Sequence, residues 1–483
     1  MFQLIDTILH EFRSCFKYKA SWCWFVVLIM GFMVRNNHGG ITSIISALRL
    51  APRLYHTMLH FFRSEGYRTE DLYKKWIDTV IKQDITVRIS DRPVVAGDHI
   101  KISKEGRRMP GIITMKQESD NSGKAEYIEG HMYGHVCAII DRNGTSRGLP
   151  LMTELQQSPP RIQGTNKPDG DTTVVQMVKL LHRTAIHMNE SVIAALDAYF
   201  SKGTAFETAS SLLTPDGRRW VEIVTRAQDN YVAYKKPIPP EIPKKGRPKD
   251  YGEKVVLRDM IKNNPDKAVQ TTMTLYGKKT KVKYLCMDLL WKPLSKDTLI
   301  RFVAVESTRG KCVLMSTDLT LTPEEIIVIY ALRFKIETSF NDQKNEVGCF
   351  YYRFWTFALP KRKRWKKKAD ETVELSEADR RKITNTKKAM AAHVCLGTIA
   401  TGILTIIAFM YVGEIWKRYR GWIKTIRTTV PSIAVVKDTL AQDLPLFLRR
   451  SSVLQTANII KSFVRSDEFL YDELVCEDSD EAA

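Results

Sequence analysis

The chain has 483 residues, of which 44% are hydrophobic and 10% aromatic. It is long enough for about three domains and apolar enough to form real cores, which excludes a disordered chain. Its 74 Lys and Arg outnumber 54 Asp and Glu, a formal net charge of +20, as expected of a protein that meets polyphosphate, although a membrane-surface protein can share this sign. The eight cysteines have no C-x-x-C spacing, which argues against zinc or a disulfide framework and favours a reducing compartment.

Residues 1–90 are predicted to be all-helical, with amphipathic segments near residues 41–50, 55–62 and 72–81. The apolar run Trp22–Val34 spans 13 residues, fewer than the roughly 20 that a membrane-spanning helix needs, so we expect a buried helix. The region could be a small DNA-binding module, and a plain helical bundle explains the pattern equally well.

Alternating strands begin at Pro93, and residues 91–236 are predicted to form the first part of an α/β core. The expected elements, in chain order, are a strand Val94–Gly97 ending in Asp98, strands 127–140 and 146–155, a helix 172–188, a strand Ser191–Leu196 delivering Asp197, and a strand Val221–Tyr234. The order strand, strand, strand, helix, strand is that of a ribonuclease-H-like core. We therefore predict a multidomain α/β fold.

The proline-rich and basic stretch 237–249 is predicted to be a linker that opens a β-strand insertion over residues 237–320. Residues 321–375 are expected to complete the core and to include a basic loop at 360–368. Residues 376–483 are expected to be helical, with a solvated acidic tail over 467–481 that carries eight carboxylates.

The late core helix is well marked by its start. Thr322-Pro323-Glu324-Glu325 supplies an N-cap hydroxyl, a proline at the first helical position and a glutamate at the third. Further along, Tyr330, Arg333, Glu337 and Lys344 follow at steps of three, four and seven, which would stack them on one helix face. Taken alone, the face could be a solvated stripe with charge pairing.

Three carboxylates occupy positions that suggest chemistry: Asp98 and Asp197 at strand ends and Glu337 on the late helix. In a ribonuclease-H-like sheet these positions converge. Carboxylate clusters suit Mg²⁺, which also takes water and substrate phosphate as ligands. Two such ions about 3.5–4 Å apart can activate the attacking oxygen and stabilise the leaving one in a phosphoryl displacement.

The spacing Tyr330-(2)-Arg333-(3)-Glu337-(6)-Lys344 resembles the signature of the insertion-sequence-four family of bacterial DDE transposases. The signature is matched in full. Outside it the resemblance rests on the order of regions: a helical end-binding domain at 1–90, a core split by a β insertion, and a helical dimerisation region at 376–483.

The resemblance implies roles for named residues. Asp98, Asp197 and Glu337 would be the catalytic triad binding two Mg²⁺, with Mn²⁺ able to substitute, and Tyr330, Arg333 and Lys344 would hold DNA. It also implies a homodimer that cuts double-stranded DNA at terminal inverted repeats and joins the ends to target DNA. We expect a cytoplasmic, nucleoid-associated bacterial protein without membrane attachment.

Further DNA contacts are suggested by basic segments. Arg247 lies in Lys245-Gly246-Arg247-Pro248, which resembles a minor-groove hook, although a basic linker is the commoner explanation. The basic loop, with Arg362, Lys363 and Arg364, could contact the DNA backbone or be a solvated hairpin tip.

Other candidates are weaker. Asp318 also ends an apolar strand and competes with Asp197, but leaves no room for an insertion before Glu337. Trp291 is expected to be a packed aromatic rather than a base-stacking residue. His131 and His135 lie in an expected strand, which makes zinc binding improbable.

Two other functions remain open: a nuclease or recombinase of the same fold that cuts without joining, and a membrane-anchored nucleic-acid-binding protein without catalysis. The second rests on residues 389–413, a 25-residue run without formal charge. Under the transposase interpretation this run is a buried C-terminal helix.

Overall fold

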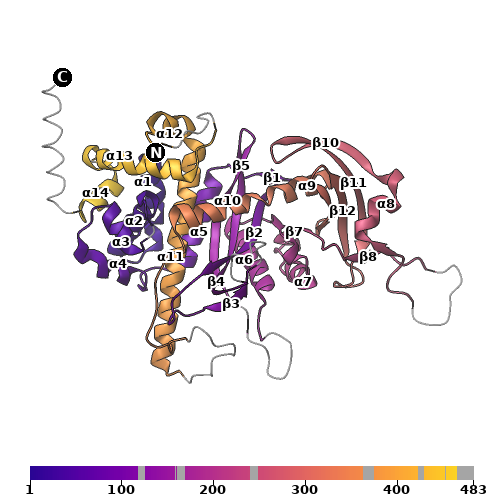
Figure 1. The fold of residues 1–483 in the computed structure, drawn as a ribbon, viewed down its shortest axis with the longest axis horizontal. Coiled ribbons are helices and arrows are strands. Elements are labelled where there is room, and N and C mark those ends of the chain that lie inside the picture. Colours follow the sequence, from indigo (N-terminus) through magenta and orange to yellow (C-terminus); the bar gives the residue numbers. More distant parts are fainter. Residues whose placement is uncertain are drawn as a thin grey trace.

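The computed structural model describes residues 1–37, 39–117, 126–157, 159, 169–239, 248–362, 375–422, 429–451 and 453–464. Arg247, Lys363, Arg364 and the acidic tail lie outside these ranges. The described chain is a mixed α/β protein built on one 13-stranded sheet (Figure 1).

The sheet has the strand order β3-β4-β2-β6-β7-β13-β12-β11-β8-β9, with β5 paired to β4, β1 to β2 and β10 to β11. The strands are β1 (Arg88–Ile89), β2 (Arg92–Ser103), β3 (Ile113–Lys116), β4 (Tyr127–Arg142), β5 (Thr145–Gln156), β6 (Val192–Leu196), β7 (Val221–Arg226), β8 (Val232–Tyr234), β9 (Lys254–Val256), β10 (Val269–Leu275), β11 (Lys278–Leu290), β12 (Leu299–Ser307) and β13 (Gly310–Ser316). Strand β2 pairs parallel with β6, and β6 parallel with β7, whereas the pairs of β4 with β2 and β5 are antiparallel.

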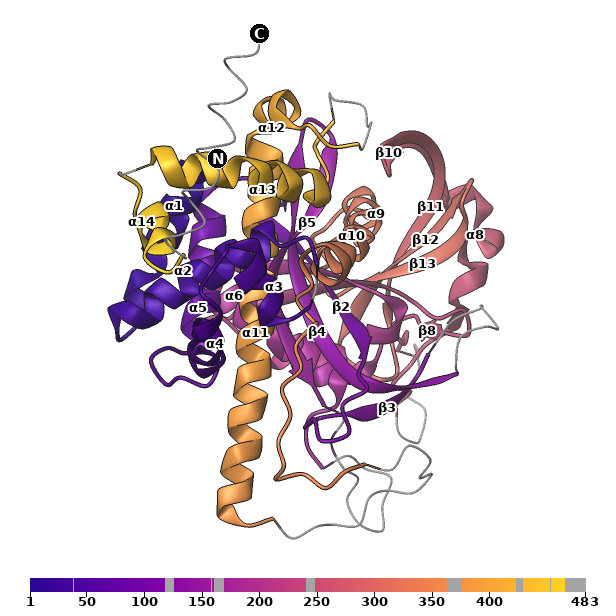
Figure 2. The ribbon, with the colours of Figure 1, turned by 60° about the vertical axis from the view of Figure 1, so that its left-hand side comes forward.

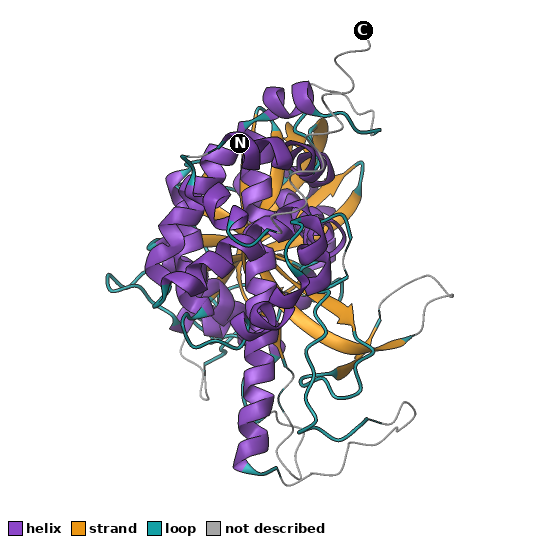
Figure 3. Cartoon of the chain, turned by 90° about the vertical axis from the view of Figure 1, so that its left-hand side faces the viewer, coloured by secondary structure: helices purple, strands orange, loops and turns teal. Residues whose placement is uncertain are grey.

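Helices from both ends of the chain form one layer beside the sheet (Figures 1 and 3). The helices are α1 (Phe2–Glu11), α2 (Lys19–Val34), α3 (Ile41–Ala47), α4 (Tyr55–Phe61), α5 (Thr69–Lys82), α6 (Thr173–Met188), α7 (Gly203–Ser211), α8 (Met260–Asn263), α9 (Pro323–Leu332), α10 (Lys335–Asn341), α11 (Glu377–Met410), α12 (Val412–Arg418), α13 (Ile433–Arg450) and α14 (Gln455–Lys461). Helix α2 packs against α11, α13 and α14, so the two regions expected as separate domains share a core.

The two faces of the sheet are covered by different helices. A Cβ added to Gly97 of β2 would meet Met177 and Leu181 of α6, which places α6 on the face of the odd-numbered β2 residues. Val94 and Ala96 instead share a core cluster with α9 and α10. Because side chains alternate along a strand, Asp98 belongs to the face covered by α9 and α10. Figure 2 shows these two helices over the sheet.

Most expected core elements are confirmed, and two differ. The antiparallel pair β4 and β5 occurs as expected, and so does the helix expected at 172–188, for which the structure shows Thr172 as the N-cap. The expected single strand 221–234 is wrong: β7 ends at Arg226, and β8 pairs with β11 on the far side of the insertion. Strand β2 also continues past Asp98 to Ser103, because its pairing with β4 continues after its pairing with β6 ends.

The insertion strands extend the core sheet instead of forming a separate one, because β13 pairs antiparallel with β7. The domain boundaries expected at 237 and 320 therefore fall within one continuous sheet and remain predictions. In Figure 1 these strands lie at the end of the molecule opposite the helical layer.

One described helix, α11, is long and apolar enough to cross a membrane. Of its most apolar 18-residue stretch, 94% is buried inside the protein. Its threonines bond the carbonyls four residues back, as Thr401 does with Gly397 at 2.8 Å. This burial is consistent with a soluble protein and agrees with the expected buried C-terminal helix. Helix α2 is likewise buried.

Candidate functional site

The parallel pairing of β2 and β6 brings two aspartates to one level. The last paired residues are Gly97 and Leu196, and Asp98 and Asp197 are the next residues of the two strands. Asp98 accepts a hydrogen bond of 2.7 Å from the backbone N–H of His99. Asp197 caps a short 3₁₀ helix by accepting from the backbone N–H of Tyr199.

Helices α9 and α10 bring Glu337 to the same face. The capping box expected at the start of α9 is confirmed: Thr322 accepts from the N–H of Glu325, whose side chain accepts from the N–H of Thr322. Helix α10 then packs across β2, β4 and β5 (Figure 2). Glu337 lies in its first turn, with 46% of its side chain exposed.

The expectation of one regular helix through residues 330–344 is wrong. Helix α9 ends before Arg333, α10 begins at Lys335, and residues 342–347 form a π-helix. Hydrogen bonds from i to i+5 widen the turn, so a seven-residue step no longer returns a side chain to the same face. Lys344 lies in this π-helix and lines a different cavity, together with Ser103 and Trp355.

Arg333 is the cation that connects the carboxylates. Its Nη1 atom lies 3.6 Å from Oδ2 of Asp98 and 3.8 Å from Oε1 of Glu337. The same atom is buried and has no hydrogen-bond partner within the described residues. The carboxylates therefore surround a positive charge without binding it closely.

The pKa of the Asp98 carboxyl is raised to about 7, chiefly by burial and also by the negative charges of Asp197 and Glu337. The N–H of His99 and the guanidinium of Arg333 act in the opposite direction. Only 17% of the Asp98 side chain is exposed. Charge crowding of this kind is common where proteins bind cations or catalyse proton transfer, although structural ion pairs also cause it.

A neutral hydrogen-bond network fixes α10 from behind. His135 is the β4 residue directly opposite Asp98, and it bonds Ser339 of α10 at 2.9 Å and Thr153 of β5 at 2.8 Å. Gln343 then donates to Thr153 at 3.1 Å and to Thr398 of α11 at 3.2 Å. Burial lowers the pKa of His135 to about 3, so its imidazole is neutral at pH 7.

Close packing adds to this support. A Cβ at Gly148 of β5 would lie 2.8 Å from the carbonyl oxygen of Lys335 and 2.9 Å from the sulfur of Cys137. The missing side chain therefore lets the first turn of α10 approach β5, and that turn carries Glu337.

The carboxylates fit Mg²⁺ by chemistry but do not form a finished coordination cage. Within the described ranges, no three His, Cys, Asp or Glu side chains are grouped closely enough to hold a metal ion. The cation that the structure places beside these oxygens is Arg333, whose Nη1 lies 3.6 Å from Asp98 and 3.8 Å from Glu337 without a hydrogen bond to either. Mg²⁺ usually needs only one or two carboxylates and completes its shell with water and phosphate oxygens.

Tyr330 lines a cavity of about 190 Å³ between α9 and the insertion strands. Arg226, Tyr276 and Arg309 line it too, and the guanidinium carbon of Arg309 lies 3.8 Å above the Tyr276 ring. Sequence reasoning missed these three residues. Arg309 sits in a tight turn beside Gly310, a weak signal that marks many surface turns equally well.

The weaker candidates have structural partners. Asp318 is buried, pairs with Arg92 and accepts from Thr320 at 2.7 Å, away from the carboxylates of Asp98 and Glu337. Trp291 packs against Phe206 and Tyr231, as expected of a core aromatic. Arg362 donates to Glu129 at 3.2 Å and to the carbonyl of Ile112 at 3.3 Å, which ties the start of the basic loop to the sheet.

Both histidines of the 130–135 segment are buried in β4 and serve structural roles. His135 belongs to the network behind α10, and His131 bonds the hydroxyl of Tyr352 at 2.6 Å and the carbonyl of Pro110 at 2.9 Å. The described hydrogen bonds of both histidines go to hydroxyl and carbonyl oxygens of the protein.

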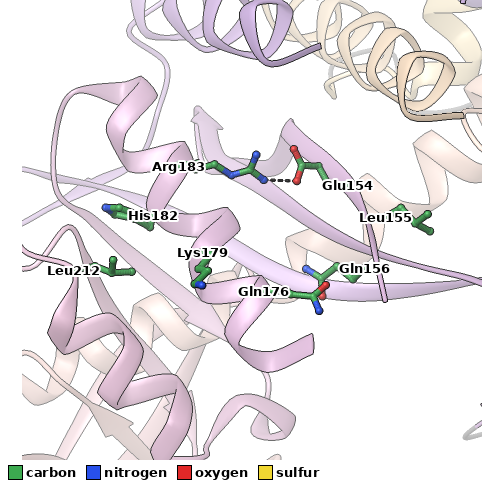
Figure 4. A pocket seen from close by; sticks show the side chains of 8 residues that line it. All are labelled: Glu154, Leu155, Gln156, Gln176, Lys179, His182, Arg183 and Leu212. Atoms are coloured by element: carbon green, nitrogen blue, oxygen red, sulfur yellow. Dashed lines mark hydrogen bonds and ion pairs between the residues drawn. The ribbon is translucent and has the colours of Figure 1, made fainter. Parts of the chain in front are cut away.

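A third cavity, of about 400 Å³, lies between β5 and α6 (Figure 4). Lys179, His182 and Arg183 of α6 line it, and Arg183 pairs with Glu154 of β5. Because α6 covers the opposite face of the sheet from α10, this cavity is separate from the Asp98 carboxylate.

Comparison with protein-family models and with curated proteins finds no match for this chain.

Proposed function

We propose that this chain is a metal-dependent DDE transposase that cuts DNA at transposon ends and joins those ends to target DNA. One observation carries the proposal: Asp98 of β2 and Glu337 of α10 lie 3.6 Å and 3.8 Å from Nη1 of Arg333, and the negative charge of Asp197, at the end of β6, also acts on Asp98. Elements far apart in the sequence thus contribute to one acidic site.

The sheet topology supports the proposal. Strands β5, β4 and β2 are antiparallel, α6 connects β5 to β6, and β6 and β7 run parallel to β2. This is the arrangement expected of a ribonuclease-H-like core, with β8–β13 as the insertion before α9. The network around His135 would keep Glu337 opposite Asp98.

Asp98, Asp197 and Glu337 are the residues that would hold Mg²⁺, or Mn²⁺ in its place. Bound there, two ions would activate the attacking oxygen and stabilise the leaving oxygen during phosphoryl transfer. The guanidinium of Arg333 would turn from the carboxylates toward a DNA phosphate, which its planar fork suits. Tyr330 would contact the DNA end from α9.

The net charge of +20 suits double-stranded DNA as the partner. We further propose that the protein acts as a homodimer on paired terminal repeats and target DNA, in the cytoplasm and at the nucleoid. The buried α11 is in keeping with this location.

The central test is Glu337→Gln, which keeps the size of the side chain and removes its charge. We expect nicking of a DNA carrying the element's terminal repeats, in the presence of Mg²⁺, to fall about a thousandfold, the effect of losing several kcal/mol of charge stabilisation. DNA binding, measured by gel shift, should be unchanged.

Glu324→Gln on α9 is the matched control, because a glutamine can still accept from the hydroxyl of Tyr284. Normal nicking by Glu337→Gln, or equal loss in both variants, would contradict the proposal. Nicking without transfer of a 3′-hydroxyl end to a second plasmid would instead indicate a nuclease of the same fold.

A further inference from the structure

The segment that follows the π-helix, residues 351–357, alternates strictly between exposed and buried side chains. Tyr351, Trp355 and Phe357 are 43%, 47% and 75% exposed, and Arg353 is exposed between them. The side chains between these are Tyr352, Phe354 and Thr356, with exposures of 3%, 5% and 8%. Period-two burial is the pattern of an extended chain with one face packed on a core.

The inward face of this segment is firmly attached. Tyr352 bonds His131 and Tyr133, and Phe354 packs against Phe62. The ammonium of Lys104 donates to the carbonyls of Phe350 and Tyr352. The backbone N–H of Thr356 donates to the carbonyl of Arg108 at 3.1 Å. The outward side chains are therefore displayed from a rigid support.

The outward face, which we call the aromatic ladder, consists of Tyr351, Arg353, Trp355 and Phe357. The rings of Trp355 and Phe357 lie 4.6 Å apart and nearly perpendicular, at 80°. The guanidinium carbon of Arg108 lies 4.9 Å from the centre of the Phe357 ring. Two exposed rings at a right angle form a corner that can take a flat group against one ring and its edge against the other.

The ladder borders a cavity of about 740 Å³ that is lined by Tyr351, Arg353 and Trp355 together with Lys104 and Lys344. Arg353 and Lys344 face one carboxylate in this lining, that of Glu105, and burial lowers the pKa of Lys104 to about 7, so the positive charge of the cavity rests on Arg353 and Lys344. Ile102 and Ser103 of β2 form another wall, four and five residues past Asp98, or about 14–17 Å along the strand. Lys344 thus faces a groove that leads away from the carboxylate site.

We propose that the aromatic ladder binds a single unpaired DNA strand, with bases stacked on Trp355 and Phe357 and phosphates next to Arg353 and Lys344. Unpaired bases offer the ring faces that exposed aromatics stack against, and duplex bases do not. Cations beside the rings match the phosphates of such a strand. That this strand belongs to the DNA being cut rests on the proposed function.

The test measures binding of a fluorescent twelve-residue oligothymidylate to the full chain by anisotropy, in EDTA so that no cleavage occurs. We expect Trp355→Ala to weaken binding roughly tenfold or more, as alanine substitution of base-stacking aromatics does. Trp355→Phe should restore most of the affinity, because it restores a ring. Phe357→Ala should act in the same direction.

Trp422→Ala is the matched control, since Trp422 is 87% exposed outside the ladder, and it should bind like the unchanged protein. Thermal melting checks that each variant is folded. Unchanged affinity for the oligothymidylate in both Trp355→Ala and Phe357→Ala would overturn the proposal. It would also be overturned if Trp355→Ala lost self-association but still bound the oligothymidylate normally. Glu337→Gln should bind the strand normally, so a failure of cleavage and a failure of the ladder give different results.

Discussion

Two polar clusters lie on the two sides of α10, and they are built in opposite ways. The front cluster holds Asp98, Arg333 and Glu337 at 3.6–3.8 Å, and Nη1 of Arg333 has no hydrogen-bond partner among the described residues. The rear cluster holds His135 between Ser339 and Thr153 at 2.8–2.9 Å without any charge. The front is loosely bonded and charged, whereas the rear is neutral and closely bonded, although Oε1 of Gln343 in its network also has no hydrogen-bond partner among the described residues.

The difference indicates that the two clusters contribute differently to stability. Buried charges without close partners lower stability, so the front cluster is retained at a cost that a cation or phosphate ligand could offset. Neutral groups that bond one another can be buried at little cost and fix geometry. The rear cluster thus positions α10 for a site whose own bonds are incomplete. The following three predictions test this contrast.

The largest change in the free energy of unfolding is expected for His135→Ala. The substitution leaves the buried hydroxyls of Ser339 and Thr153 without His135 and opens a cavity, so we expect the free energy of unfolding to fall by about 2–4 kcal/mol. Nicking should also fall, by roughly 10- to 100-fold, as for other residues that orient a ligand. Urea denaturation and nicking assays on the same samples would check both.

His135→Gln offers the conservative comparison, because an amide can both donate and accept. It should recover part of the stability and part of the nicking. If His135→Ala left both quantities unchanged, α10 would not depend on the rear cluster.

The next effect is a stabilisation by Asp98→Asn in the metal-free protein. The folded pKa of Asp98 is raised to about 7, so folding favours the protonated form. The protonated Asp98 carboxyl therefore contributes to the free energy of unfolding. That contribution is fully present below the unfolded pKa near 4 and is lost as pH rises through about 7. At pH 8 we expect Asp98→Asn to raise the free energy of unfolding by about 2 kcal/mol, after allowance for partial solvation. Nicking should be abolished.

Asp318→Asn is the control with the opposite sign. Burial alone would raise the pKa of Asp318, but bonds from Thr320 and Arg92 lower it below its usual range. Its charged form is therefore favoured by folding, and the variant should be less stable at pH 8. If Asp98→Asn and Asp318→Asn lowered the free energy of unfolding equally in chelator-treated protein, the charge of Asp98 would not destabilise the folded state.

The smallest effect is expected for Gly148→Ala. The added methyl group would lie 2.8 Å from the Lys335 carbonyl oxygen, so α10 must shift away from β5. We expect a loss of about 1–2 kcal/mol in the free energy of unfolding and weaker nicking. Gly413→Ala, where nothing lies within 4 Å of the new methyl group, should leave thermal stability equal or improved. A normal Gly148→Ala variant would mean that the close approach of α10 is not needed.

Local sequence patterns sufficed for several elements. The Thr322 capping box, the helix expected at 172–188 and the strands expected at 127–140 and 146–155 depend on residues a few positions apart, whose hydrogen bonds and periodicity can be inferred from the chain alone. The buried helix at Trp22–Val34 follows from its length and apolar composition. Asp98 and Asp197 were identified because each follows a short apolar run in the sequence, although in the structure Asp98 lies within β2 and only Asp197 comes after the end of its strand.

The remaining features were decided by tertiary structure. The bridging role of His135 and the shared core of the terminal helices depend on contacts between residues far apart in sequence. The interruption of the helix at Arg333 was not predicted by the sequence pattern. The alternation at 351–357 is visible in the sequence only as an aromatic run, because which rings face outward depends on what packs beneath them. The sequence by itself determined which residues carry charge and where local elements begin. Long-range packing determined which of those charges meet, because it sets the distances and the burial on which their interactions depend.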